Sequence, residues 1–460
     1  MSATTAAAIL KRTIATRLIY FLYQVLQIVF SPVVALYLLY RGIRDRAYFA
    51  HLPERFGFLP PAYTATGARV VWFHAVSVGE VLSAVELIKR WKQDDPGICV
   101  FLSTTTLAGR ATAVQRVKEH VFFLPLDYRS MVRRVLRRLR PCAVVILETE
   151  IWPNLYREAK RAGAAVMMVN ARISDRSLPS YTRAAGFFRH VLCWPDAIFA
   201  QTEEDARRLR LAGAPDGAVQ AAGNLKFDFN PPASGIAFEV AAFLHRAQPT
   251  AVWVAASTTA SNAAGDPDED DAVLSAFASL NRPGLVLILA PRQPQRFEIV
   301  AEKLTRAGVP FARRTALTSA PSAARVLLLD SIGELAALFE RAAVVFMGGT
   351  LTSRGGHNIL EPAYFGKPVI AGPHMENFAA IAAEFTAGGA LVRIANSDEL
   401  VDAVARLLDD PERAASIGAK ARALALSKRG VVDRVLAEIR TQAGFGVPNP
   451  PRTLAARLAL

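Results

Sequence analysis

Apolar residues recur along most of this chain as short continuous runs, separated by longer amphipathic stretches. The runs can be read as two series of strands: residues 70–73, 99–102, 143–147, 165–169, 197–200 and 219–222, then 252–255, 285–289, 326–329, 343–346, 369–371 and 391–394. Continuous rather than alternating runs are typical of parallel strands that helices cover on both faces. Helical stretches separate them, for example residues 81–93, 203–212, 295–307 and 397–408. The pattern predicts an α/β protein with two doubly wound parallel sheets.

A break rich in proline and glycine separates the two series. Residues 230–235 read Asn-Pro-Pro-Ala-Ser-Gly, which is a composition suited to an interdomain linker. We therefore expect an N-terminal Rossmann-like domain over residues 49–230, a C-terminal one over 236–440 and a tail over 441–460, with the two domains facing each other across a cleft. Ligands of such sheets bind at the carboxyl ends of the strands, so the strand-to-helix loops should carry the chemistry.

The first 48 residues form a different kind of segment. Residues 18–40 carry no formally charged side chain, and as a helix they would be about 35 Å long, enough for a hydrocarbon core of about 30 Å. The length and the lack of a small-residue cleavage site do not fit a signal peptide. Gln24, Gln27 and Pro32 interrupt the apolar pattern. We expect a membrane anchor that either spans the bilayer or only inserts into it, with a buried or interface-lying helix that never crosses the bilayer as the alternative.

Composition narrows the class of protein. Hydrophobic residues make up 52% and charged residues 20%, which excludes a disordered chain and a coiled coil. Lysine and arginine exceed aspartate and glutamate by 54 − 40 = 14. Such an excess indicates an anionic partner: a nucleic acid, a membrane surface or a phosphorylated substrate. Because no recognition motif or aromatic-basic interleaving appears, we expect no nucleic acid. The arginine-rich residues 129–140 are either a solvated helix face or a contact for an anionic membrane.

Several common sites are poorly supported. Cys99, Cys142 and Cys193 are the only cysteines and are widely spaced, so we expect buried core thiols in a reducing compartment rather than disulfides or a zinc site. The chain has no GxGxxG at a helix start, no GxxxxGK[ST] and no HExxH. A dinucleotide oxidoreductase, a P-loop ATPase and a zinc protease are therefore not indicated, and no metal or cofactor is expected.

Carboxylates follow two strands of the first series. Glu80 comes after the first strand and enters the first turn of the next helix, where it could take a proton from an acceptor hydroxyl. Helix-start electrostatics explain the same placement equally well. Glu148 and Glu150 follow the strand over residues 143–147. Glu148 could hold an acceptor or tune Glu80, whereas Glu150 could cap the helix or pair with an arginine.

Three strand ends of the second series can hold an anionic nucleotide. Glycine pairs over residues 348–356 precede a helix start, which allows backbone N–H groups to approach a phosphate. Glu361, near that start, could accept hydrogen bonds from a ribose diol. Arg292 offers a guanidinium for a phosphate, and the loop after residue 329 could offer backbone groups to a base. The acidic residues 265–271 could bind a divalent cation, but surface capping of a helix is the favoured interpretation.

Taken together and in order, seven motifs make the chain resemble the 3-deoxy-D-manno-oct-2-ulosonic acid (Kdo) transferases of lipopolysaccharide synthesis. The motifs lie at residues 54–57, 74–80, 148–154, 170–172, 223–228, 354–362 and 366–368, so the resemblance covers nearly the whole chain. It implies a GT-B fold and an inverting, metal-independent transfer of Kdo from CMP-Kdo to a lipid A precursor, a tetraacyl disaccharide bisphosphate. It also implies an anionic surface, that of the inner membrane, with the catalytic domains facing the cytoplasm.

The resemblance also implies roles for individual residues. Glu80 would be the general base, and Glu148 and Lys226 would stabilise the transition state. The CMP-binding residues would be Pro291, Arg292, Ser331, Ile332, Gly333, Gly349, Asn358, Ile359, Leu360 and Glu361. These assignments agree with the chemistry, because a sugar that leaves CMP as a charge-spreading cation needs carboxylates near the sugar and cationic groups near the phosphate.

The chain departs from the family pattern at one loop. The family usually shows Ser-Thr-His-Glu-Gly-Glu where residues 257–262 read Ser-Thr-Thr-Ala-Ser-Asn, followed by the acidic insertion, and Gln293 stands where a histidine is common. We expect a divergent branch that retains the chemistry. The alternatives are a membrane-associated GT-B transferase that uses another nucleotide sugar, and a non-catalytic glycan-binding module.

Overall fold

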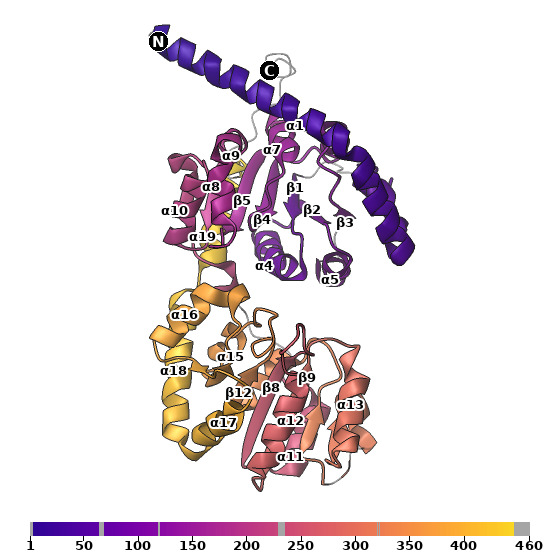
Figure 1. The fold of residues 1–460 in the computed structure, drawn as a ribbon, viewed down its shortest axis with the longest axis vertical. Coiled ribbons are helices and arrows are strands. Elements are labelled where there is room, and N and C mark those ends of the chain that lie inside the picture. The colour runs from indigo at the N-terminus through magenta and orange to yellow at the C-terminus, as the bar shows by residue number, and fades with distance from the viewer. Residues whose placement is uncertain are drawn as a thin grey trace. The chain divides into compact units, whose positions relative to one another are not determined.

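The chain folds into two compact units (Figure 1). The computed structural model describes residues 3–63, 69–117, 120–228, 235–319, 321 and 323–445. Met1–Leu225 and Gly430–Leu460 form the first unit, and Lys226–Arg429 form the second. Each unit holds a seven-stranded sheet whose strands pair in parallel. The predicted α/β fold with two doubly wound sheets is confirmed.

The first sheet has the strand order β3-β2-β1-β4-β5-β6-β7. Strands β1 to β3 are added toward one edge and β4 to β7 toward the other, so the strand order reverses between β1 and β4 although all the strands are parallel. Its strands are β1 (Val70–His74), β2 (Cys99–Thr104), β3 (His120–Phe123), β4 (Ala143–Leu147), β5 (Ala165–Ala171), β6 (Ala197–Ala200) and β7 (Val219–Ala221). The helices of this unit are α1 (Ala3–Arg44), α2 (Ala47–Ala50), α3 (Leu52–Arg55), α4 (Val78–Asp94), α5 (Leu107–Val117), α6 (Arg129–Leu139), α7 (Pro153–Arg161), α8 (Leu178–Arg183), α9 (Ala185–Val191), α10 (Glu203–Leu211) and α19 (Val431–Gln442).

The second sheet has the order β10-β11-β9-β8-β12-β13-β14 and reverses between β8 and β12. Its strands are β8 (Ala251–Thr258), β9 (Leu285–Pro291), β10 (Phe311–Arg313), β11 (Val326–Leu328), β12 (Val344–Met347), β13 (Val369–Ala371) and β14 (Val392–Arg393). Its helices are α11 (Phe238–Ala247), α12 (Glu269–Leu280), α13 (Arg296–Arg306), α14 (Leu335–Leu338), α15 (Leu360–Tyr364), α16 (Ala379–Ala387), α17 (Glu399–Asp409) and α18 (Pro411–Ser427).

Both faces of each sheet are buried, as the continuous apolar runs require. Along β1, Val71 and Phe73 pack into one hydrophobic cluster, whereas Val70 and Trp72 pack into the cluster on the opposite face. Strand β8 divides its residues between two clusters in the same way. Because successive side chains of a strand point to opposite faces, a run with no polar member is stable only between two helical layers.

Two edge strands are absent from the predicted series, which has one strand too few for each sheet. Strands β3 and β10 lie at the edges of the two sheets. Strand β10 has only three residues, Phe311–Arg313, and of these only Ala312 is buried. A run so short and so weakly apolar does not differ from loop sequence. The sequence of β3 does carry the apolar signal, since Val121, Phe122 and Phe123 are buried, so its omission from the first series was wrong.

The last described helix packs with the first unit, although the sequence places residues 431–440 in the C-terminal domain. Val431, Val435 and Ile439 are buried against the cluster that contains Val71 of β1. Gly223 allows the close approach: its φ is 104°, and a Cβ there would lie 2.8 Å from a methyl group of Val431. The chain therefore passes between the units twice, and the first unit is discontinuous in sequence.

The remaining expectations concern the linker, the tail and the cysteines. Residues 230–234 of the expected linker and residues 446–460 of the expected tail lie outside the described residues. The three cysteines form no disulfide, but the prediction that they are buried is wrong, because Cys99, Cys142 and Cys193 are all partly exposed. Cys142 still packs against the core of the first unit, so its thiol covers the edge of that core rather than filling it.

Candidate active site

Glu80 lies in the first turn of α4, just after the carboxyl end of β1. Ser77 is the N-cap residue: its Oγ accepts a hydrogen bond from the Glu80 backbone N–H at 3.4 Å and donates one to Glu80 Oε1 at 2.8 Å. The backbone N–H of Val76 donates to Glu80 Oε2 at 2.8 Å. This arrangement is similar to a capping box, with the Val76 N–H and the Ser77 hydroxyl as the donors to the glutamate. The first turn of the helix therefore holds the carboxylate in place with donors from its own loop.

Burial changes the chemistry of the Glu80 carboxylate. The residue is only 7% exposed, and this burial is the main cause that raises its pKa above the ordinary value. The negative charge of Glu148 raises the pKa further, while the Val76 hydrogen bond opposes the change. A carboxylate whose pKa is raised is a stronger proton acceptor once it is ionised.

Glu148 follows β4, the neighbour of β1 in the sheet. Its φ is 55°, in the left-handed region that residues other than glycine rarely adopt. Its backbone N–H donates to the Val169 carbonyl at 2.7 Å, and Arg172 Nε lies 3.9 Å from Glu148 Oε2. A backbone strain of this kind costs about 1–3 kcal/mol and is concentrated at functional sites.

Glu150 adds a third carboxylate to this edge of the sheet. Its pKa is raised to about 7, first by burial, then by the negative charges of Glu80 and Glu148. The sequence left capping or an arginine as partners for Glu150, but its strongest charged neighbours are these two carboxylates. Glu80, Glu148 and Glu150 therefore form a carboxylate cluster at the point where the strand order reverses, which is the expected ligand position of such a sheet.

In the second unit, charged side chains gather at the carboxyl ends of β9 and β12. Burial lowers the pKa of His357 to about 3, and the positive charges of Arg292 and Arg354 lower it further. Burial raises the pKa of Glu361, against the opposing effects of Asn358 and Arg292. Asn358 Nδ2 donates to Glu361 Oε1 at 3.2 Å. The structure thus brings Arg292, Asn358 and Glu361 together, and two arginines there can face an anion.

The glycine loop that precedes these residues leaves little space. Gly349 has φ 70°, and a Cβ at this position would lie 2.8 Å from His357 Nε2. That nitrogen is buried and has no hydrogen-bond partner in the described structure. The expected helix start is present, but α15 has only five residues, so its dipole contributes little. An anion here would depend on the arginines and on loop N–H groups.

The remaining residues of the expected CMP site differ in what they can offer. Pro291 ends β9, next to Arg292. Ile359 and Leu360 are fully buried in the core, so they could meet a ligand only through the backbone. Ser331, Ile332 and Gly333 follow β11, which β9 and β8 separate from β12. In this loop Ile332 is 59% exposed and Gly333 has φ 95° with open space around it.

Lys226 lies where the chain leaves the first unit. The sequence places it in the N-terminal domain, but the structure counts it with the second unit. It belongs to a single 3-10 turn, Leu225–Phe227, and its Nζ lies 4.6 Å from the centre of the Phe378 ring. The Tyr364 hydroxyl donates to the Phe227 carbonyl and so attaches this turn to α15.

Glu269, in the acidic insertion, is a residue whose importance the sequence analysis missed. The predicted role, capping of a helix at the protein surface, is confirmed for Asp268, the N-cap residue of α12. It is wrong for Glu269, which is fully buried. The Glu269 carboxylate accepts hydrogen bonds from the backbone N–H groups of Gly349, Thr350 and Leu351 at 2.7–3.0 Å. It also accepts from the Thr259 N–H at 2.8 Å. Glu269 therefore holds the glycine loop in its conformation.

The neighbouring Asp270 is also fully buried, and its partners are protein groups rather than an ion. Thr258 Oγ1 donates to Asp270 Oδ1, and Arg296 binds Oδ2 through its guanidinium. Among the described residues, no group of three or more His, Cys, Asp or Glu side chains is arranged to hold a metal ion. The signal that could have found both acids is their place at the start of the helix that follows β8, in the connection that leaves the carboxyl end of a central parallel strand.

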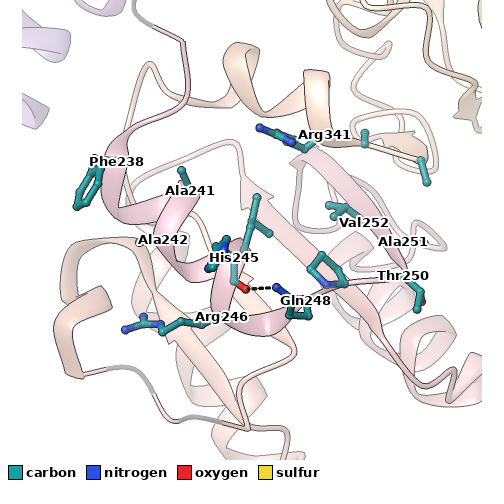
Figure 2. A pocket seen from close by; sticks show the side chains of 14 residues that line it. Phe238, Ala241, Ala242, His245, Arg246, Gln248, Thr250, Ala251, Val252 and Arg341 are labelled. Atoms are coloured by element: carbon teal, nitrogen blue, oxygen red, sulfur yellow. Dashed lines mark hydrogen bonds between the residues drawn. The ribbon is translucent and has the colours of Figure 1, made fainter.

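A cavity of the second unit lies away from these residues (Figure 2). Its volume is about 960 Å³, and its lining includes Ala251 and Val252, at the amino end of β8, with His245 and Arg341. Figure 2 shows Gln248 bonded to the His245 carbonyl on the α11 side of the cavity. Arg292 and Glu361 follow carboxyl ends of strands, so this cavity belongs to the opposite edge of the sheet.

Two doubly wound parallel sheets with polar groups at their reversal points define the class of two-domain α/β proteins that includes GT-B glycosyltransferases. The S. aureus MnaA–UDP complex is similar in fold, with 17% identity, a TM-score of 0.56, and coverage of 83% of this chain and 99% of that chain. So is a glycosyltransferase from Rickettsia africae ESF-5, with 10% identity, a TM-score of 0.54, and coverage of 82% and 99%. Residues 318–424 match the family described as "Glycosyl transferases group 1".

The sequence of the first unit is more specific. Residues 50–229 match the family described as "3-Deoxy-D-manno-octulosonic-acid transferase (kdotransferase)". The 3-deoxy-D-manno-octulosonic acid transferase of Haemophilus influenzae is 30% identical over 421 residues, which cover 90% of this chain and 97% of that protein. Its counterpart from Bordetella pertussis is 34% identical over 392 residues, 84% of this chain and 90% of that protein. The chain belongs to the Kdo transferase family and is a glycosyltransferase.

Proposed function

We propose that this glycosyltransferase moves Kdo from CMP-Kdo to a lipid A precursor, the tetraacyl disaccharide bisphosphate, with inversion at the anomeric carbon. Glu80 takes the proton from the acceptor hydroxyl, the hydroxyl oxygen forms a bond to the anomeric carbon, and the bond from that carbon to the phosphate of CMP breaks. The observation that carries this proposal is the buried Glu80 carboxylate with its raised pKa, at the reversal point of its sheet. A single inverting displacement needs one such base.

The other residues are assigned to the stabilisation of charge and to the binding of the donor. Glu148, beside Glu80, and Lys226 stabilise the transition state, in which positive charge develops on the sugar and negative charge on the leaving phosphate. In the second unit Arg292 faces the phosphate, and Glu361 accepts from the ribose diol. The proximity of Arg292 to Glu361 and His357 supports this division, since both pKa values respond to its charge.

Because the proposed acceptor is a lipid, the enzyme would act at a membrane. A bisphosphorylated lipid is presented at a charged surface, and the chain has an excess of 14 basic residues over acidic ones. Ile14–Arg44 of α1 is long and apolar enough to enter a bilayer. We infer that the enzyme acts at the cytoplasmic face of the inner membrane, where a reducing compartment suits three cysteines that form no disulfide.

The experiment that tests the proposal is a transfer assay with the full-length protein in its membrane. CMP-Kdo and the tetraacyl disaccharide bisphosphate are supplied, and CMP release and the mass of the acceptor are followed. Release of CMP together with the gain of one or more Kdo residues supports the proposal. A folded preparation that releases no CMP but turns over a UDP-sugar is a different GT-B transferase. A preparation that binds the glycan and turns over nothing is a binding module.

A further inference from the structure

Helix α1 presents a broad apolar surface that nothing in the described structure covers. Its outward positions are 41–72% exposed and include Leu18, Phe21, Leu22, Val25, Leu26, Ile28, Val29, Phe30, Val33, Leu36, Leu39 and Ile43. In length and composition alone, the helix is suited to crossing a bilayer. The contacts of its remaining face decide between crossing and lying flat.

The first half of α1 is bonded side-on to the first unit. Tyr20 is 1% exposed, and its hydroxyl donates to the Pro153 carbonyl at 3.0 Å. The Tyr23 hydroxyl donates to Asp127 Oδ2 at 3.0 Å, and Gln27 Nε2 donates to the Asp127 carbonyl at 2.9 Å. Positions 20, 23 and 27 lie on one stripe of a helix. This stripe is therefore occupied by protein over two turns, next to α7 (Figure 1).

The far end of α1 is attached to the same unit. The Arg41 guanidinium lies 4.5 Å from the centre of the Tyr48 ring, and the Arg55 guanidinium lies 5.7 Å from the same ring. Arg55 is buried and donates to the Thr105 carbonyl at 2.9 Å, in the loop after β2. Gly42 lies against Phe49, with no room for a Cβ. Both halves of the helix thus end on one folded domain.

Pro32 does not interrupt this course. Its missing N–H would leave the Ile28 carbonyl without a backbone donor, but Ser31 Oγ donates to that carbonyl at 2.7 Å. The helix therefore continues from Tyr20 to Arg41, and these residues are about 32 Å apart along the axis. A crossing helix would place them on opposite sides of a hydrocarbon core of about 30 Å. One water-soluble domain cannot hold both ends without entering the core itself.

We propose that α1 lies in the plane of the membrane surface, with its apolar face in the lipid and its Tyr20–Gln27 stripe on the first unit. This inference rests on the membrane association given under the proposed function and specifies its form. An in-plane helix of this kind buries its apolar face about 5–10 Å into the boundary between headgroups and acyl chains.

The charged side chains next to α1 indicate which kind of lipid headgroup the helix contacts. Buried Glu158 is surrounded by Arg129, Arg133 and Arg161, and the Arg157 guanidinium lies 4.4 Å from the centre of the Tyr20 ring. Four arginines and one glutamate leave 4 − 1 = +3 beside the apolar face. Arg129 and Arg133 are each 41% exposed. Anionic phospholipid headgroups meet both requirements, a hydrocarbon layer and negative charge at its rim.

The decisive measurement is the side of the membrane on which each end of α1 lies. Arg17→Cys and Arg44→Cys variants of the full chain, in sealed vesicles of equal parts phosphatidylcholine and phosphatidylglycerol, are treated with a membrane-impermeant maleimide. The unmodified chain, with its three partly exposed cysteines, sets the background. We expect both positions to be labelled from the side that carries the folded domain. Labelling of the two positions from opposite sides overturns the proposal.

Depth gives a second, independent readout. An environment-sensitive fluorophore is placed on Leu22→Cys, Val29→Cys and Leu36→Cys, with Val114→Cys on α5 as a control that stays in water. Quenching by spin-labelled lipids should report one shallow depth for all three α1 positions. A gradient with Val29 deepest is the result of a crossing helix. No quenching at any position, together with a concentration-dependent dimer, shows that a second copy covers the face instead, and also overturns the proposal.

The lipid charge is tested by binding to vesicles with and without phosphatidylglycerol. Arg129→Gln and Arg133→Gln should each weaken binding to anionic vesicles about fivefold, whereas Arg207→Gln on α10 should have no effect. Equal losses in all three variants contradict the assignment of this cluster. None of these measurements uses donor or acceptor, so they can fail while Kdo transfer succeeds, and the reverse.

Discussion

Glu80 and Glu269 occupy equivalent places in the two units and are used in opposite ways. Each follows the first strand of its sheet, next to the reversal point, and each lies in the first turn of the next helix. The donors to Glu80 come from its own loop, residues 76 and 77, and its charged neighbour is another carboxylate. The donors to Glu269 include three N–H groups of the loop after β12.

The difference separates a reactive carboxylate from a structural one. Glu80 has few donors and a like charge beside it, so it can change its protonation state without disturbing the fold. Glu269 is the acceptor for four backbone N–H groups, each of which would cost about 1–3 kcal/mol if left unsatisfied. A buried acid near the end of a strand is therefore not by itself evidence for catalysis. Whether its hydrogen-bond donors come from its own loop or from a distant segment distinguishes the reactive acid from the structural one.

The largest expected effect is that of Glu80→Gln on turnover. Loss of a general base should lower kcat about 10²–10⁴-fold. Thermal stability should be nearly unchanged, because glutamine also completes a capping box. CMP affinity should be unchanged as well. Glu86→Gln, on the same helix and partly exposed, is the matched control and should retain full activity. Turnover within tenfold of the native enzyme would show that Glu80 is not the base.

Glu269→Gln should show the reverse pattern. The amide oxygen can replace only part of the acceptor capacity, and the amide NH₂ would face N–H donors, so we expect a loss of about 2–4 kcal/mol in the stability of the second unit. Affinity for CMP should fall with it, as measured by calorimetry alongside chemical unfolding. Asp271→Asn, two residues further on and exposed, should change stability by less than about 0.5 kcal/mol. A stable Glu269→Gln protein with native CMP affinity would remove the distinction between the two acids.

Gly349→Ala tests whether the shape of the glycine loop matters for the donor. A left-handed residue other than glycine costs about 1–2 kcal/mol, and here the added Cβ also meets His357 Nε2 at 2.8 Å. We expect CMP to bind about tenfold more weakly. Gly308→Ala has a similar φ of 64° and no atom within 4 Å, so it carries the backbone cost alone. If both variants bind CMP like the native chain, the loop does not contact the donor.

The smallest effect concerns pH and Glu150. Its folded-state pKa of about 7 lies above the ordinary 4.5, so the fold favours the protonated acid. The stability that this provides is complete below the ordinary pKa and is lost as the pH rises through about 7. Glu150→Gln has no proton to lose, so its stability relative to the native chain should improve as the pH rises from about 5 to about 8. Parallel unfolding curves at both pH values would show that Glu150 titrates as an ordinary acid.

Much of the fold could be predicted because its signals are local. Continuous apolar runs such as Val70–His74 and Leu285–Pro291 identify buried parallel strands, and the loops after them identify the side of the sheet that carries Glu80 and Arg292. Signals that depend on distant segments could not be recovered. The burial of Glu269 requires N–H groups eighty residues away, and the placement of α19 requires a fit against Gly223.

How α1 meets the membrane could not be predicted from the sequence for the same reason. Tyr20, Tyr23 and Gln27 are compatible with a spanning segment when composition alone is considered. Only their partners, Pro153 and Asp127, show that one stripe of the helix is bonded to protein. Helix length predicts what a segment could do in a bilayer, whereas side-chain contacts show which of the possibilities the fold permits.

The return of the chain to the first unit sets an order of events during synthesis. Val431, Val435 and Ile439 belong to the core beneath β1, more than three hundred residues after that strand. On the ribosome, the second unit has its whole sequence before the first unit has its last helix. The N-terminal half must therefore wait, with one face of its sheet incompletely covered, until α19 has been translated.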